Sequence, residues 1–185
     1  MRSHEDHPVD WIDSRSIDDM IHHREAILES HVGGMDADHE TIVDELGVEH
    51  GTDEERMAAW FDRCIGDLRS VFASGTAVLH RAIGVGDPEA FAAGVQDGSG
   101  LGFHWTSEIL CAATSYHGGP AERCDVLITA SVPPDAVDWP TTLQMRFAHP
   151  HEREVSVHGS VDVMTIVDMR DDGILRTFGR LPLEA

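Results

Sequence analysis

The hydrophobic pattern of this chain changes near Gly75, and that change constrains the fold more than any other feature. One long stretch before it repeats apolar residues at helical spacing: Met57, Trp60, Phe61, Cys64, Ile65, Leu68, Val71 and Phe72. Thr52 and Glu55 stand at capping-box spacing where that stretch begins. After Gly75, short strand-like runs are separated by Gly, Pro and Asp. Helices followed by strands predict an α+β protein with a largely antiparallel sheet system.

The expected elements divide the chain into an N-terminal helical region, 1–75, and a strand-rich core, 76–185, which together form one compact unit. Asp13 or Ser14 is the expected cap of a first helix that runs through Ile17 and Leu28 and stops at Gly33-Gly34. Further helices are expected at 40–46, 52–72 and 108–116. Strands are expected near 77–84, 102–106, 124–132, 153–158, 161–169 and 174–178, and residues 133–140 are expected to form a loop or single turn.

The charge of the chain restricts its partners. The net charge is −21, all 13 basic residues are Arg, and the acidic residues are spread along the whole length. Such a surface disfavours nucleic acid and anionic membranes as partners. It suits a protein that stays hydrated in concentrated salt, which screens self-repulsion. We therefore expect a halophilic archaeal host or a virus of one; a bacterial or phage genome rich in GC explains the missing Lys, but not so large an acidic excess.

Cysteine spacing and hydropathy limit the classes of protein to which the chain can belong. The three cysteines, Cys64, Cys111 and Cys124, are widely spaced and form no CxxC, which argues against a disulfide framework or a structural zinc site. The N-terminus lacks the apolar stretch of a signal peptide, and no apolar run has the length of a membrane span. A cytoplasmic protein is expected, in the host cytoplasm or associated with a virion if the source is viral. The oligomeric state is left open.

Three phrases after Gly75 carry candidate chemistry. Val78-Leu79-His80-Arg81-Ala82-Ile83 comes first, Trp105-Thr106-Ser107 follows, and Glu152-Arg153-Glu154-Val155 comes last. Residues two apart on a strand point to one face, so Glu152 and Glu154 are expected to face one cleft. In order and spacing, the three phrases resemble the ADP-ribosyltransferases of the Arg–Ser–Glu class, over residues 75–170. In that family an arginine on the first strand, a Ser/Thr motif on the second and Glu-x-Glu on a later strand form the site.

The resemblance implies a fold, a substrate and a set of roles. The fold would be an ADP-ribosyltransferase-like core of two packed, mostly antiparallel sheets, and NAD would be the substrate. Arg81 would hold a diphosphate oxygen of NAD, where a planar guanidinium fits well. Glu154 would be the catalytic carboxylate, bonded to the ribose 2′-hydroxyl and stabilising an oxocarbenium-like transition state. Glu152 would orient the acceptor. In the family, a glutamate at this position accompanies an arginine acceptor, so an arginine of a protein substrate is expected here.

The remaining site residues follow from the same resemblance. Thr106 and Ser107 would brace the glutamate and the ribose, while Trp105 and Tyr116 are stacking candidates for nicotinamide. The chain departs from the family pattern in reducing Ser-Thr-Ser to Trp-Thr-Ser. It also places His80 beside Arg81, and a sister class uses a first-strand histidine. Neighbouring strand residues face opposite ways, so only one of the two can share the face of Glu154.

Two other functions stay open from the sequence. The chain could be a catalytically inactive virion or interaction protein that keeps a transferase-like fold, because a fold alone does not confer activity. It could also be a metal hydrolase. The densest histidine cluster is His149-Pro150-His151-Glu152, and the histidines that could join it are His104, His117 and His158. No His-x3-His with an associated Glu supports a zinc site, so none is expected.

Overall fold

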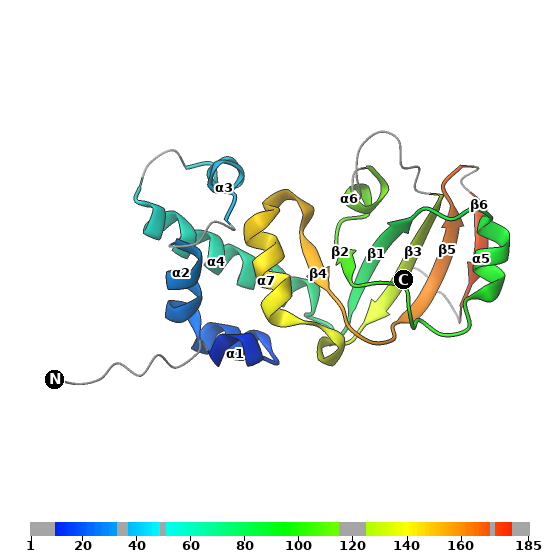
Figure 1. Ribbon diagram of the computed structural model, residues 1–185, viewed down its shortest axis with the longest axis horizontal. Coiled ribbons are helices and arrows are strands. Elements are labelled where there is room, and N and C mark those ends of the chain that lie inside the picture. Colours follow the sequence, from blue (N-terminus) through cyan, green and yellow to red (C-terminus); the bar gives the residue numbers. More distant parts are fainter. Residues whose placement is uncertain (1–9, 33–36, 49–50, 115–124, 171–172, 179–185) are drawn as a thin grey trace. The chain divides into compact units, whose positions relative to one another are not determined.

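The computed structural model describes residues 10–32, 37–48, 51–114, 125–170 and 173–178 (Figure 1). These residues form a mixed α+β structure with a six-stranded antiparallel sheet, which confirms the expected fold class. The chain divides into two compact units. The first contains residues 1–69 and 139–151, and the second contains residues 70–138 and 152–185. Residues 139–151 thus group with the helices of the N-terminal region although they follow most of the strands in sequence.

The first unit is helical. Its elements are η1 (Asp10–Asp13), α1 (Ile17–His22), α2 (Arg24–Val32), α3 (His39–Leu46), most of α4 (Asp53–Val71) and α7 (Trp139–Ala148), followed by the start of η3 (Pro150–Glu152). The expected first helix is divided at His23, and Ser16 caps it instead of Asp13 or Ser14 by accepting from the Asp19 amide. The capping box before α4 is confirmed by reciprocal hydrogen bonds between Thr52 and Glu55, at 2.9 and 3.2 Å.

The helix α7 was not expected, and it completes the core of the helical unit. Trp139, Leu143 and Phe147, one helical turn apart, are all buried. Trp60 of α4 donates through Nε1 to the carbonyl oxygen of Arg146 at 3.0 Å. The buried guanidinium of Arg146 is neutralised by Asp67 at 2.5 Å.

The second unit is built on the sheet, whose strand order is β4-β2-β1-β3-β5-β6. The strands are β1 (Ala77–Ile83), β2 (His104–Thr106), β3 (Val126–Val132), β4 (Glu154–Ser156), β5 (Asp162–Asp168) and β6 (Gly173–Thr177). The unit also contains α5 (Pro88–Gly94), α6 (Ile109–Thr114) and η2 (Pro134–Ala136). Figure 1 shows the six strands side by side. The expectation of two packed sheets is corrected for the described residues, because β2 pairs with both β1 and β4 and so joins all the strands into one sheet.

The two faces of the sheet differ in chemistry. One, here called the apolar face, presents Leu79, Ile128 and Ile166, each 0% exposed. The opposite face carries a row of polar side chains, one from each strand, because residues paired across strands point the same way. This polar row consists of Glu154, Thr106, His80, Thr129, Thr165 and Thr177. The polar row contains Glu154 and Thr106, which the sequence predicted as site residues, and His80, the alternative to Arg81.

Candidate functional site

The register of three neighbouring strands brings the sequence motifs together. His80 of β1 pairs with Thr106 of β2, and Thr106 pairs with Glu154 of β4. Figure 1 shows β1, β2 and β4 as neighbours, although β4 follows β2 by almost fifty residues in sequence. Side chains directly opposite one another on a sheet lie about 5 Å apart, so His80 and Glu154 are roughly 10 Å apart across Thr106. The register therefore places all three side chains on one face of the sheet, where Thr106 and Glu154 are buried and His80 is half-buried.

Arg81 does not share the face of Glu154. It pairs with Ile128, which places it on the apolar face. Its Nη1 donates to the carbonyl oxygen of His104 at 2.5 Å, and its guanidinium fills the space over Gly102. A Cβ added to Gly102 would lie 2.6 Å from Nη2 of Arg81. The expectation that Arg81 and Glu154 face one cleft is not met, because strand alternation gives that position to His80.

Glu152 and Glu154 do not share a strand face either, which corrects another expectation. Glu152 closes the 3-10 turn η3, and β4 begins only at Glu154. Between them Arg153 has a φ of 48°, in the left-handed region that interrupts extended backbone. The backbone oxygen of Glu152 accepts from the Thr106 hydroxyl at 2.8 Å. This hydrogen bond fixes the backbone of Glu152 beside β2.

Glu154 is a fully buried carboxyl group, with 0% of its residue surface exposed. Burying an ionised carboxylate is costly unless hydrogen bonds replace its water shell. The Ser156 hydroxyl donates to Oε1 at 3.1 Å, and Nδ1 of His104 forms a short hydrogen bond to the same oxygen. Ser156 and His104 are themselves paired across β4 and β2. Three residues on two strands thus form one polar cluster on the face of the polar row.

His104 connects this buried carboxylate to solvent. Its side chain is 38% exposed, whereas that of Glu154 is not exposed at all. An ionised Glu154 places the proton of their hydrogen bond on Nδ1, which leaves Nε2 as the nitrogen able to accept a proton. The arrangement matches a carboxylate-oriented imidazole in an acid–base pair. From the sequence, His104 was considered only as a possible metal ligand. Its position two residues before Thr106, on the same face of the expected strand, was the signal that could have identified it.

The polar row holds His80 in a defined orientation. Nδ1 of His80 and the hydroxyl of Thr129 form a hydrogen bond of 3.0 Å. Burial lowers the pKa of His80, and the nearby Glu108 carboxylate offsets only part of that shift. The imidazole is therefore neutral at pH 7, and it can exchange hydrogen bonds with a hydroxyl but adds no charge to bind a phosphate.

Hydrogen bonds to the backbone hold the second-strand motif in place. Thr106 is buried, and its hydroxyl accepts from the Glu108 amide at 3.1 Å, just before α6, while it donates to the Glu152 carbonyl. Trp105 is buried on the face opposite Thr106, and its Nε1 donates to the Gly102 carbonyl at 3.1 Å. Ser107 follows β2 and is half-buried. Tyr116, the other stacking candidate, lies outside the described residues.

Metal and thiol chemistry gain no support from the described residues. Within those ranges no group of three or more His, Cys, Asp or Glu is placed to hold a metal ion. His117, one of the possible ligands, lies outside them. Burial raises the pKa of the Cys64 thiol to about 12, and it also raises the pKa of Cys111. A thiol with so high a pKa stays protonated and is a poor nucleophile.

Three surface pockets are formed by other parts of the second unit. They are lined by the segment from Glu89 to Leu101, by Ser160 to Val163 and by Ile174 to Phe178. His80, Thr106 and Glu154 line none of these three. The candidate site is therefore a row of side chains across three strands and not one of these concavities.

Comparisons of the chain with protein families, with curated proteins and with solved structures found no match. Among the helices of the described residues, none combines the length and apolar character needed to cross a membrane.

Proposed function

We propose that this chain is an NAD-dependent mono-ADP-ribosyltransferase in which His80, Thr106 and Glu154 form the reactive row. The observation that supports this most is the paired register of these three residues on adjacent strands. The class that the sequence resembles has a first-strand arginine, a second-strand hydroxyl and a late glutamate at one site. The register supports the hydroxyl and the glutamate, and His80 stands where Arg81 was expected, as in the sister class with a first-strand histidine.

The proposed reaction breaks the bond between the ribose C1′ and the nicotinamide nitrogen, and the bonding electrons leave with neutral nicotinamide. A nitrogen of the acceptor side chain then bonds to C1′ and loses a proton. Positive charge develops on the ribose as the first bond breaks, so a carboxylate beside the sugar lowers the barrier. Glu154 takes this role by accepting from the ribose 2′-hydroxyl. Its burial strengthens the interaction, because the surroundings screen charge less than water does.

His104 is the proposed base for the acceptor. Its hydrogen bond to Glu154 orients the ring, and its side chain is 38% exposed, so a protein substrate can reach it from solvent. Glu152 was the earlier candidate for this step, but it lies before the strand and outside the polar row. Arginine of a protein partner remains the proposed acceptor, since deprotonating a guanidinium is the step that most needs an oriented base.

One observation favours a second candidate function. The Glu154 carboxylate is fully buried, and His104 and Ser156 both bond to its Oε1. A site permanently closed in this way would suit an interaction protein that keeps the fold without turnover. The enzyme requires Glu154 to become accessible to NAD while its hydrogen bond to His104 is kept.

The experiment that separates these functions is an assay of nicotinamide release, together with transfer of labelled ADP-ribose, in concentrated KCl. The wild type is expected to release nicotinamide and to label a protein in a host lysate. Glu154→Gln keeps the size and one hydrogen-bond acceptor but loses the charge, and it should lower turnover by at least about 100-fold. Glu152→Gln is the matched control, and it should change NAD turnover by less than about threefold.

Absence of nicotinamide release from the folded wild type, from low to saturating KCl, would overturn the enzyme and favour the interaction protein. Equal loss in Glu152→Gln and Glu154→Gln would overturn the assignment of the polar row as the reactive site.

A further inference from the structure

Glu108 is an exposed carboxylate that follows β2 and directly precedes α6. Its amide donates to the Thr106 hydroxyl at 3.1 Å, and Thr106 lies between His80 and Glu154 in the polar row. Burial lowers the pKa of His80, and the charge of Glu108 opposes this shift, so the carboxylate lies close to that ring. Glu108 is therefore a charged group at the polar row that the proposed reaction leaves without a role.

A guanidinium of the chain itself already meets this carboxylate. Nη1 of Arg153 lies 3.6 Å from Oε1 of Glu108, and the two side chains are 37% and 52% exposed. Among the residues that the structure describes, no other side chain is paired with the Glu108 carboxylate. The separation is longer than a good hydrogen bond, and so exposed an ion pair contributes little to stability. A second guanidinium can therefore displace Arg153 at small cost.

One hydroxyl holds the backbone on both sides of this ion pair. Thr106 accepts from the Glu108 amide and donates to the carbonyl of Glu152, the residue before Arg153. In a continuous strand, residue 153 would face away from Glu154. Arg153 has instead a φ of 48°, in the left-handed region, and its side chain meets Glu108. Such backbone strain is concentrated at functional sites in proteins, and here it falls on the residue that carries the guanidinium.

The charges that act on Cys111 support this arrangement from the side of α6. Burial raises the pKa of Cys111, the charges of Glu152 and Glu108 raise it further, and the charge of Arg153 lowers it. Two carboxylates and one guanidinium thus act on the same thiol of α6. Since the negative charges outnumber the positive one, this neighbourhood favours a further cation over an anion.

We propose that Glu108 binds the guanidinium of the acceptor arginine, and that Arg153 occupies this carboxylate until the acceptor displaces it. The inference rests on the proposed function and concerns the choice of acceptor at the same site. A guanidinium can donate two parallel hydrogen bonds to a carboxylate, which is a stronger contact than the single one that Arg153 makes. His104, the proposed base for the acceptor, begins the strand that leads to Glu108.

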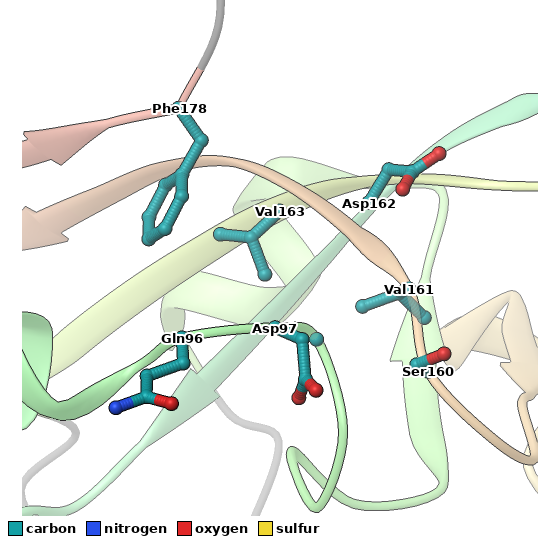
Figure 2. Close-up of a pocket in the computed structure, with 8 residues that line it drawn as sticks. Gln96, Asp97, Ser160, Val161, Asp162, Val163 and Phe178 are labelled. Atoms are coloured by element: carbon teal, nitrogen blue, oxygen red, sulfur yellow. The ribbon is translucent and has the colours of Figure 1, made fainter.

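The kinetic test measures the KM for N-acetyl-arginine amide as acceptor, with saturating NAD in concentrated KCl. Glu108→Gln should raise this KM at least about tenfold, with a smaller change in kcat. Arg153→Gln frees the carboxylate and should lower the KM at least about twofold. Asp162→Asn is the control for net charge and should leave the KM unchanged. Asp162 is an exposed residue of a separate pocket, and Figure 2 shows its side chain turned away from Gln96 and Asp97.

Opposite shifts of KM in the two variants are the result that competition for one carboxylate predicts. If the ion pair between Glu108 and Arg153 only stabilised the fold, both substitutions would change the KM in the same direction, and that result would overturn the proposal. A rise in Asp162→Asn equal to that in Glu108→Gln would also overturn it, because it would show general attraction of the acceptor to an acidic surface.

A binding measurement separates the failure of this inference from the failure of the proposed function. N-acetyl-arginine amide or its neutral analogue N-acetyl-citrulline amide is added to the full chain without NAD, and amide chemical shifts are followed. Arginine should shift the signals of residues 106–112 and 153, and citrulline should bind at least about tenfold more weakly. A variant with altered circular dichroism is excluded from the comparison, and the citrulline result then decides.

The two failures give different results. Absence of nicotinamide release from the folded wild type would overturn the proposed function, and with it the role of Glu108 toward an acceptor. Nicotinamide release together with equal binding of arginine and citrulline, or with shifts that map elsewhere, would overturn this inference alone.

Discussion

His80 and Arg81 are sequence neighbours on β1, but they lie on opposite faces of one sheet and have different surroundings. On the polar row, His80 bonds to Thr129 and stands beside Thr106, in line with the buried Glu154. On the apolar face, Arg81 donates to a backbone carbonyl and fills the space over Gly102. His80 is therefore surrounded by polar side chains, whereas the guanidinium of Arg81 is bonded to the backbone at the first residue of β2.

An arginine in an apolar strand can thus have a packing role while the next residue lies on the face of the candidate site. Both residues are half-buried, so burial does not distinguish them. The distinction comes from what each side chain contacts and from which face it shares with Glu154. Each of the following changes tests one side of the comparison.

The largest expected effect is on the free energy of unfolding, when side chains on the two faces of the sheet are truncated. Ile128→Ala removes a side chain that is 0% exposed on the apolar face, and it should lower the free energy of unfolding by about 2–5 kcal/mol. Thr129→Ala, the next residue and part of the polar row, should lower it by about 1 kcal/mol or less. Urea unfolding at fixed KCl measures both. A larger loss from Thr129→Ala than from Ile128→Ala would contradict the assignment of the faces.

A smaller effect tests the role of Arg81 at Gly102. Gly102→Ala places a methyl group 2.6 Å from Nη2 of Arg81 at a φ of 91°, and it should destabilise the fold by about 1–3 kcal/mol. In an Arg81→Ala background, where the clashing side chain is absent, Gly102→Ala should cost less free energy of unfolding, although the backbone strain at residue 102 remains. A double-mutant cycle should show coupling of at least about 0.5 kcal/mol. Strict additivity of the two free energies would show that Arg81 does not occupy this space.

The smallest effect concerns the titration of His80. Its pKa is lower in the folded protein than in the unfolded chain, so protons bind the unfolded chain more readily. Stability is complete above the unfolded value near 6.5 and falls as the pH drops through the lower folded value. His80→Gln should flatten this decline, which unfolding curves at a series of pH values will reveal. An unchanged pH slope in the variant would mean that His80 is not desolvated in the polar row.

Much of the secondary structure could be predicted from local pattern. The strand expected at 77–84 is observed at Ala77–Ile83, and the Thr52–Glu55 capping box forms as its spacing indicated. The helix α5 was missed although Asp87 caps it and Pro88 occupies its first turn, which is a recognisable start signal. The helix α7 was missed because a proline at its second residue suggested a loop, whereas proline is tolerated in a first turn.

The local sequence pattern could not predict which residues lie together at the candidate site. Apolar residues occur at both parities of β1, so the sequence could not say which face was apolar or whether His80 or Arg81 joined Glu154. The register between β1, β2 and β4 decides this, and it depends on pairing between distant segments. The positive φ of Arg153, which separates Glu152 from Glu154, was equally hidden, because arginine rarely adopts it.

The most direct test of the polar row as the reactive site is the rate of nicotinamide release in two variants at neighbouring positions. In concentrated KCl, with folding verified by circular dichroism, His80→Ala should reduce the rate at saturating NAD by at least about tenfold. Arg81→Lys, which keeps a donor and a positive charge on the other face, should retain at least about half of the wild-type rate. The reverse result, with turnover lost in Arg81→Lys and kept in His80→Ala, would contradict the account.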